Sequence, residues 1–237
     1  MKKNRTNPLT RHSLLWVLSL FLPFFSLNAQ KRVKDYCGLY YTSMESLRQR
    51  QYRELEFFNF QPGQTVASIG AQCGHFEAAY AATTDSVHFY LGDIDSTYFN
   101  QRQLNFAWHY YDSLRGRPMT CPYTMIIGTE KSTLLPENRF DKIVIINSFH
   151  EFTYRDEMLT DIKTKLKSGG ILYIDETVPK KEGELHVVCK MPMLTQEEMI
   201  SLLSKNGFKY LEGKEIVFRK NKIFRKIYAF VKTASPG

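Results

Sequence analysis

The chain has 237 residues, a hydrophobic fraction of 43%, a charged fraction of 24% and a formal net charge of +8. This length and composition fit one large globular domain or two small ones, and they exclude a disordered chain, a collagen-like chain, a polytopic membrane protein and a disulfide-dense miniprotein. Because so positive a charge can indicate a nucleic acid or an anionic surface as partner, its distribution along the chain has to be considered first.

The first 29 residues carry four basic side chains and no acidic one, which is half of the net charge. They contain an apolar run at residues 14–27, interrupted by Pro23 and followed by Ala29. A basic head, a short apolar stretch and a small residue at its end are typical of a secretory signal peptide. The run is shorter than the roughly 20 residues that a membrane-spanning helix needs. We therefore predict that residues 1–29 are a signal peptide cleaved after Ala29, with an uncleaved membrane anchor as the alternative.

The rest of the chain alternates between helical and extended patterns. An N-terminal helical extension is predicted at residues 30–60, where Thr42 and Glu45 match a capping box. Short apolar segments that break at Gly, Asn or Asp predict strands, and amphipathic segments between them predict helices. The predicted strands span residues 65–70, 87–91, 123–127, 142–147 and 171–175, and the first is followed by a helix at residues 75–82.

Helix boundaries are predicted from local capping signals. Ser96 is placed to begin the helix after the second strand. The pair Gly169-Gly170 is placed to end the helix after the fourth strand, as a glycine C-cap does. Thr195 and Glu198 match a second capping box, which begins the last helix.

Strands separated by helices of this length imply βαβ crossovers and therefore a largely parallel sheet. Two closing strands, at residues 214–218 and 226–232, resemble a hairpin. The predicted architecture is α/β, with a doubly wound, mostly parallel sheet and an antiparallel C-terminal edge hairpin in one domain, residues 61–237.

Residues 30–237 carry a net charge of only +4, because the predicted signal peptide takes the other four charges. We interpret their one basic cluster as the solvated edge of the closing hairpin, and we expect no nucleic-acid partner. This cluster consists of Arg219, Lys220, Lys222, Arg225 and Lys226.

All four cysteines follow the predicted signal peptide. In an exported protein they permit three pairings, and the sequence does not choose among them. His186 and Cys189 are spaced by three, but no second pair has ligand spacing, so we predict no metal site. The cysteines are Cys37, Cys73, Cys121 and Cys189.

A glycine-rich turn follows the first predicted strand, and an acidic residue ends the second. Gly70 and Gly74 bracket the turn, which opens a helix, and Asp93 lies 19 residues after Gly74. Glycine permits positive φ and a close backbone approach, and a carboxylate accepts both hydroxyls of a ribose. The pattern therefore favours a nucleoside-bearing ligand at the carboxyl ends of the strands.

From residue 54 to residue 232 the chain resembles the class I S-adenosylmethionine-dependent methyltransferases. The resemblance implies a Rossmann-like sheet, S-adenosyl-L-methionine as cofactor and methyl transfer to an acceptor. A dinucleotide-binding oxidoreductase fits less well, because the G-x-G-x-x-G pattern is absent. Five segments carry the resemblance in the order of the family: FQPGQTVASIGAQCGHFEAAYA, FYLGDID, GTEKSTLLPENRFDKIVIINSFHEF, MLTDIKTKLKSGGILYIDE and LTQEEMISLLSKNGFKYLE.

The chain departs from the family at three of the positions that contact the cofactor. Ser68 stands where an acidic residue is usual, Gln72 replaces the central glycine of the loop, and Thr129 stands where an aspartate often contacts the adenine. The cofactor-binding residues implied by the resemblance are Ser68, Gly70, Gln72, Gly74, Asp93, Ile94, Thr129, Glu130 and Asn147.

The loop after the fourth predicted strand lies where the family addresses the methyl acceptor. The resemblance makes Asn147 and His150 the candidate catalytic residues, with His150 as a base for an acceptor that bears a proton. The alternative for His150 is a structural side chain that caps the following helix. We interpret Asp175 and Glu176, after the fifth strand, as solvated carboxylates.

Two functional hypotheses follow. The first is a methyltransferase acting on a small-molecule acceptor, and the second is an exported, non-catalytic protein of the same fold that binds another ligand or a protein partner. The departures in the glycine loop favour the second, and the retained Asp93 favours the first. Export predicts a periplasmic or extracellular location, an uncleaved leader predicts membrane anchoring through the N-terminal segment alone, and the oligomeric state stays open.

Overall fold

The computed structural model describes residues 41–217 and 224–233 of the chain. These residues belong to one compact unit, Asp35–Gly237. The predicted signal peptide, Cys37 and the basic residues at positions 219–222 lie outside the described residues. None of the helices in the described ranges combines the length and the apolar character that crossing a membrane requires.

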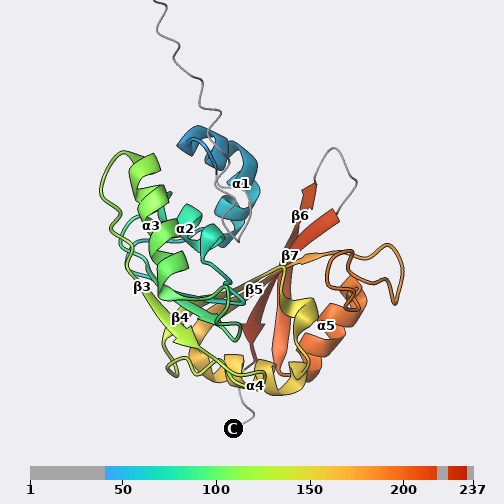
Figure 1. Cartoon of the computed structure of the whole chain (residues 1–237). Helices are drawn as coiled ribbons and strands as arrows, with labels where there is room; N and C mark the ends of the chain where they lie inside the picture. Colours follow the sequence, from blue (N-terminus) through green and yellow to red (C-terminus); the bar gives the residue numbers. More distant parts are fainter. Residues whose placement is uncertain (1–40, 218–223, 234–237) are drawn as a thin grey trace, which may run out of the picture. The chain divides into compact units, whose positions relative to one another are not determined.

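A seven-stranded sheet forms the centre of the unit, with the strand order β3-β2-β1-β4-β5-β7-β6 (Figure 1). The first five strands pair in parallel, whereas β7 runs antiparallel to both β5 and β6. This confirms the predicted mostly parallel sheet with an antiparallel edge. The strands are β1 Thr65–Ile69, β2 His88–Asp93, β3 Tyr123–Ile127, β4 Phe140–Ile146, β5 Leu166–Thr177, β6 Phe208–Val217 and β7 Phe224–Lys232.

Helices cover both faces of the sheet. Helices α1, α2 and α3 pack on one face, where Phe58, Tyr80 and Leu104 join one apolar cluster. Helices α4 and α5 pack on the other face, where Ile162 and Leu203 join a second cluster. The helices are α1 Met44–Phe58, α2 His75–Ala81, α3 Gln101–Arg115, α4 Arg155–Lys165 and α5 Gln196–Lys205, with a 3-10 turn η1 at Phe149–Glu151.

The helix N-caps confirm one prediction and correct two. The capping box of Thr195 and Glu198 is present at the start of α5. The N-cap of α1 is Ser43 rather than Thr42. The N-cap of α3 is Asn100 rather than Ser96, because Asp95 first accepts a hydrogen bond from the Thr97 N–H (2.9 Å) and forms a separate turn.

The glycine pair does not end α4. The helix stops at Lys165, and β5 begins at once with Leu166. Gly169 has φ +75°, and a Cβ on Gly170 would meet the Phe140 carbonyl oxygen at 2.8 Å. The pair therefore forms an irregularity within β5, where the pairing register with β4 shifts.

A buried charged group joins α1 to the strands β5 and β7. Asp175 is fully buried and accepts a hydrogen bond of 3.0 Å from Arg225 Nε. Glu54 is also buried, with Oε1 3.9 Å from an Arg225 nitrogen, and burial raises the pKa of Glu54. The interpretations of Asp175 as a solvated carboxylate and of Arg225 as a solvated base are therefore wrong, because the pairing of β7 with β5 brings Arg225 against Asp175, beside Glu54 of α1.

We expect Arg225→Met to lower the free energy of unfolding by about 3–5 kcal/mol, because it leaves two carboxylates buried without a cation. Urea denaturation of the full chain measures this. The double variant Arg225→Met/Asp175→Asn should recover part of the loss, and Arg102→Met, at an exposed position on α3, should stay within about 0.5 kcal/mol of the wild type. Equal effects of Arg225→Met and Arg102→Met would show that the buried group adds no net stability.

Candidate functional site

A cavity of about 540 Å³ lies at the carboxyl ends of β1, β2 and β4. The strand order reverses between β1 and β4, and ligands of open α/β sheets bind at such a switch point. Ser68 and Gly74 do not line the cavity. Seven of the nine predicted cofactor-binding residues do line it: Gly70, Gln72, Asp93, Ile94, Thr129, Glu130 and Asn147.

The glycine loop is tightly constrained by its neighbours. Gly70 has φ +77°, and a Cβ there would lie 2.7 Å from the Ser148 Cβ. Gly74 has φ +68°, and a Cβ there would lie 2.6 Å from a Leu104 methyl carbon. Gln72 also has positive φ, +46°, which is costly for a residue with a side chain. The loop therefore keeps two glycines where its neighbours leave no room, while it carries a side chain at the central position.

Asp93 fastens the glycine loop to the end of β2. Its Oδ2 accepts a hydrogen bond of 2.8 Å from the Gln72 N–H, and its Oδ1 accepts bonds of 2.7 and 2.9 Å from the N–H groups of Ile94 and Asp95. A carboxylate offers about four lone-pair positions, so three are already in use. One acceptor position is left, so binding both hydroxyls of a ribose requires one hydroxyl to share an acceptor position with one of these N–H groups.

A buried carboxylate contacts Ser68, the position at which the family usually has an acidic residue. The Ser68 hydroxyl donates a hydrogen bond of 2.6 Å to Glu77 Oε1, from the first turn of α2. Glu77 lines the cavity and is only 3% exposed. Burial raises the pKa of Glu77 to about 7. The acidic group that the resemblance places at position 68 thus comes from the following helix.

Glu77 is not among the residues predicted from the sequence. The available signal was a single acidic residue in an otherwise apolar, alanine-rich helix directly after the glycine loop. That signal alone does not separate a buried carboxylate from a solvated one, because it leaves the face of the helix undetermined.

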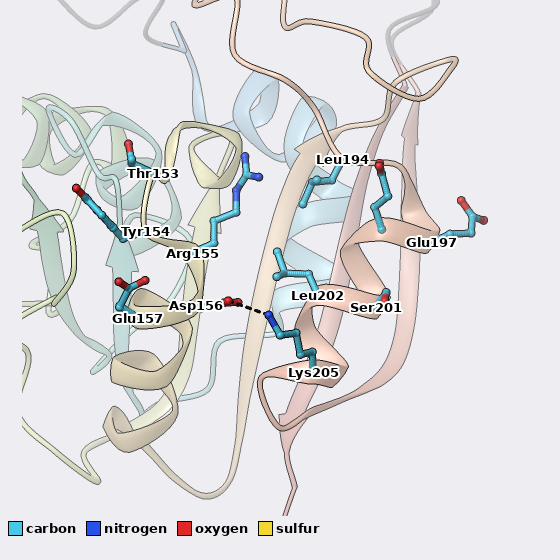
Figure 2. A pocket seen from close by; sticks show the side chains of 11 residues that line it. Thr153, Tyr154, Arg155, Asp156, Glu157, Leu194, Glu197, Ser201, Leu202 and Lys205 are labelled. Atoms are coloured by element: carbon cyan, nitrogen blue, oxygen red, sulfur yellow. Dashed lines mark hydrogen bonds and ion pairs between the residues drawn. The ribbon is translucent and has the colours of Figure 1, made fainter.

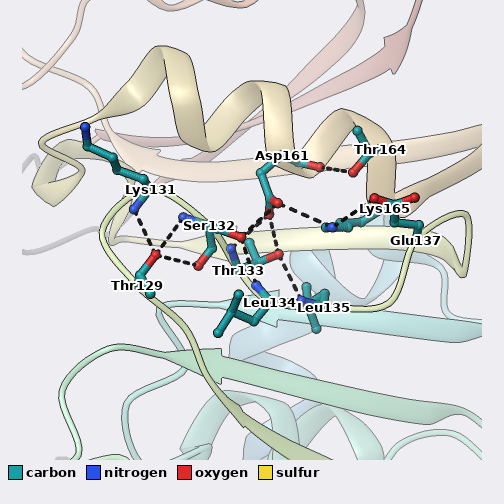
Figure 3. A network of polar contacts seen from close by, with 10 residues as sticks. All are labelled: Thr129, Lys131, Ser132, Thr133, Leu134, Leu135, Glu137, Asp161, Thr164 and Lys165. Carbon is teal, nitrogen blue, oxygen red and sulfur yellow. Dashed lines mark hydrogen bonds and ion pairs between the residues drawn. The ribbon is translucent and has the colours of Figure 1, made fainter.

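The loop after β3 is held by Asp161 of α4 (Figure 3). Asp161 accepts hydrogen bonds from the Ser132 hydroxyl (3.0 Å) and the Thr133 N–H (2.9 Å). Burial raises the pKa of Asp161, but these bonds outweigh that effect and hold it below its usual value. The Thr129 hydroxyl accepts the Ser132 N–H (3.0 Å) within the same turn, so the exposed Glu130 is the carboxylate that this loop presents to the cavity.

Asn147 projects from the end of β4 in a left-handed conformation, with φ +50°. Its N–H donates to the Asp175 carbonyl oxygen (2.7 Å), and its side-chain oxygen accepts a hydrogen bond of 3.3 Å from the Thr177 hydroxyl. Strained residues of this kind persist where the surroundings hold them and are frequent at functional sites. The structure therefore brings Asn147 to the cavity with a fixed backbone.

His150 does not line the cavity, although its neighbours Ser148 and Glu151 do. It is 2% exposed, and its Nδ1 lies 3.0 Å from both carboxylate oxygens of Glu176. Glu176 is 4% exposed, so its interpretation as a solvated side chain is wrong. Within the described part of the chain no side chain caps α4, so the capping role considered for His150 is not what the structure shows.

Cys73, in the glycine loop, is disulfide-bonded, and its partner lies outside the described residues. Cys121 and Cys189 are free thiols. With two free thiols, none of the three complete pairings that four cysteines permit is formed.

A second, shallower depression of about 790 Å³ lies between the start of α4 and α5 (Figure 2). Asp156 and Lys205 form an exposed ion pair of 3.0 Å across it. No predicted site residue lines this depression, and exposed ion pairs contribute little energy. The candidate site is therefore the cavity at the strand ends.

We expect Glu77→Gln to stabilise the protein at pH 8 by about 1–3 kcal/mol and to have little effect at pH 5. The folded state holds the Glu77 proton up to a pH of about 7, above the value of an unfolded glutamate. Stability is therefore lost as the pH rises through this window, and the glutamine variant does not lose it. Urea denaturation at both pH values tests this, with Glu182→Gln, at an exposed position, as the control. A wild type and a variant that respond to pH alike would contradict the buried, protonated state.

No family model matches the chain, and no curated protein matches it. Solved structures do match. A SAM dependent methyltransferase from Aquifex aeolicus is 18% identical, with 81% of this chain and 100% of that chain covered and a TM-score of 0.57.

Two further structures match to a similar degree. The Burkholderia thailandensis 1,6-didemethyltoxoflavin-N1-methyltransferase, solved with bound 1,6-didemethyltoxoflavin and S-adenosylhomocysteine, is 16% identical over 79% of this chain and 78% of that chain, with a TM-score of 0.59. The [4+2]-cyclase SpnF is also 16% identical, over 80% of this chain and 82% of that chain, with a TM-score of 0.59. At these identities the likeness concerns the fold: the chain has the fold of the class I S-adenosylmethionine-dependent methyltransferases.

Proposed function

We propose that the protein is an S-adenosylmethionine-dependent methyltransferase that acts on a small molecule. The observation that carries the proposal is the junction of the glycine loop with Asp93 at the rim of the cavity. The cavity volume of about 540 Å³ falls within the range of about 300–1,000 Å³ that small-ligand sites occupy. The similar fold of the 1,6-didemethyltoxoflavin methyltransferase, which binds a small molecule, supports a small acceptor here as well.

The lining of the cavity supports an orientation for the cofactor. Asp93 is the acceptor for ribose hydroxyls, and the exposed Glu130 is the carboxylate nearest in sequence to the position where the family contacts the adenine amine. The loop from Gly70 to Gln72 is then left for the methionine end. The Gln72 side chain, which replaces a glycine there, would restrict the space at that end.

When bound, the cofactor would supply a sulfonium methyl group: an acceptor lone pair would bond to the methyl carbon in line with its carbon–sulfur bond, which breaks so that the neutral thioether leaves. The contribution of the chain is chiefly to align the acceptor with that methyl group. The backbone N–H of Asn147 donates to Asp175 and its side-chain oxygen accepts from Thr177, which leaves the side-chain NH₂ to orient an acceptor. His150 reaches the cavity only through its neighbours, so a base role for it requires a relay or a small movement of the loop.

Two features of the cavity favour the alternative hypothesis, a non-catalytic protein of the same fold. Gln72 occupies the central position of the glycine loop, and Asp93 already accepts three backbone hydrogen bonds. One of the similar structures, SpnF, is a cyclase, and one fold commonly hosts several activities. An exported, non-catalytic protein of this fold that binds another ligand or a protein partner is the alternative.

Calorimetric titration of the 30–237 protein with S-adenosylmethionine and with S-adenosylhomocysteine tests the proposal. Asp93→Asn should weaken both ligands by about 10–100-fold, because charge-assisted hydrogen bonds to the ribose are lost. Asp95→Asn removes the same charge from the same rim and is the matched control, since the Asp95 side chain accepts the Thr97 N–H instead.

Both ligands carry the ribose, but S-adenosylhomocysteine lacks the positive sulfonium charge. A lost ribose contact therefore weakens both ligands, whereas a lost attraction for the sulfonium weakens S-adenosylmethionine alone. A loss confined to S-adenosylmethionine, or an equal loss in the Asp95→Asn variant, would contradict the ribose assignment. Absence of binding of either ligand at millimolar concentration would contradict the methyltransferase proposal and favour the alternative.

We also infer export from the leader-like first 29 residues. Mass spectrometry of the protein isolated from the producing cells should find a mature chain that begins at Gln30. An intact N-terminus in a membrane fraction would show an uncleaved anchor instead.

A further inference from the structure

Three side chains with metal-binding atoms meet beside the cavity: His150, His186 and Cys189. Their ligand atoms all lie within 4.8 Å of one another. The two imidazole rings have centroids 4.4 Å apart, and His186 Nδ1 lies 3.2 Å from Cys189 Sγ. His150 belongs to η1 after β4, whereas the other two belong to the loop between β5 and α5.

His150 is oriented as a metal ligand would be. Nδ1 lies 3.0 Å from both Glu176 oxygens, so the tautomer with its proton on Nδ1 donates a hydrogen bond to this carboxylate and has its lone pair on Nε2. This Nε2 is buried and has no hydrogen-bond partner among the residues that the structure describes. A buried nitrogen without a partner is costly, and a carboxylate on the opposite nitrogen is the usual second partner of a metal-bound histidine.

The other two side chains are positioned by the backbone of their own loop. The His186 N–H donates to the Met191 carbonyl oxygen (2.8 Å), and the Lys190 N–H donates to the His186 carbonyl oxygen (3.0 Å). These bonds close a tight turn that contains Cys189. His186 is half-buried and lines the cavity, and Cys189 is a half-buried free thiol.

We propose that His150 Nε2, His186 and Cys189 Sγ bind one divalent transition-metal ion of the zinc class. Imidazole and thiolate suit zinc, whereas magnesium and calcium prefer oxygen ligands. In a tetrahedral zinc site two nitrogen ligands lie about 3.4 Å apart, and a nitrogen and a sulfur about 3.6 Å. Because the ligand atoms already lie within 4.8 Å of one another, no pair has to close by more than about 1.4 Å.

Binding would displace the thiol proton of Cys189, so that the thiolate and two neutral imidazoles hold the ion. Three protein ligands leave one position open. Glu151 has Oε1 3.8 Å from His150 Nε2, and both Glu151 and His186 line the cavity. The open position consequently faces the cavity, where either Glu151 or a bound molecule can fill it.

The sequence predicted no metal site, because His186 and Cys189 are the one pair in it with ligand spacing. The third ligand comes from a different loop, and only the pairing of β4 with β5 brings that loop close.

Titration of the untagged full chain with Co²⁺, without reducing agent so that the Cys73 disulfide is retained, tests the site. We expect one equivalent to bind with the visible absorption of a tetrahedral ion and with thiolate-to-cobalt charge-transfer absorption, and Zn²⁺ to displace it. Cys189→Ser should abolish the charge-transfer absorption. Glu176→Gln should weaken binding by about 10–100-fold while all three ligands remain.

Matched controls separate the site from adventitious binding. Cys121→Ser removes the other free thiol, and His109→Gln removes an exposed histidine of α3; both should bind cobalt as the wild type does. Circular dichroism shows whether each variant is folded. Failure of the folded wild type to bind cobalt, or unchanged cobalt spectra in Cys189→Ser and His186→Gln, would overturn the proposal. The metal alone is the probe, so the result does not depend on whether S-adenosylmethionine binds.

Discussion

The parallel pairing of β1 with both β2 and β4 is the constraint on which the candidate site depends. It aligns three carboxyl ends at one edge of the sheet and reverses the strand order there. The glycine loop after β1, Asp93 at the end of β2 and Asn147 after β4 therefore border one cavity, although they are far apart in the chain. Gly74 is the N-cap of helix α2, and Leu104 leaves no space for a side chain at that position.

A second feature follows from the alternation of side chains along β5. Asp175 turns toward Arg225 and Glu54, beneath α1, whereas Glu176 turns toward His150. The two adjacent carboxylates thus have different roles: Asp175 links β5 to β7 through Arg225, and Glu176 orients His150 beside the cavity. Both are buried, so each depends on its partners to offset the cost of desolvation.

The cavity combines features of an active site with features that restrict its ligand. The positive φ values of Gln72 and Asn147 are strained backbone at the wall of the cavity, and the buried Glu77 stands behind the loop. Gln72 lines the cavity at the central position of the glycine loop, and the Asp93 carboxylate already accepts three backbone hydrogen bonds. His150 in the loop after β4, with His186 and Cys189 beside it, adds donor atoms that a simple alignment of acceptor and methyl group does not need.

Local patterns in the sequence were enough to predict the order of strands and helices, the glycine loop, Asp93 and the antiparallel edge, because apolar periodicity and turn residues are local signals. Most of the cofactor-binding residues implied by the family resemblance line one cavity. The roles of Glu77, Arg225 and Glu176, and the meeting of His150 with the loop that carries His186 and Cys189, emerge only from the folded chain. Whether a charged side chain is solvated or buried depends on which distant elements pack against it, as Arg225 of β7 and Glu54 of α1 do at Asp175, and no local pattern records those contacts.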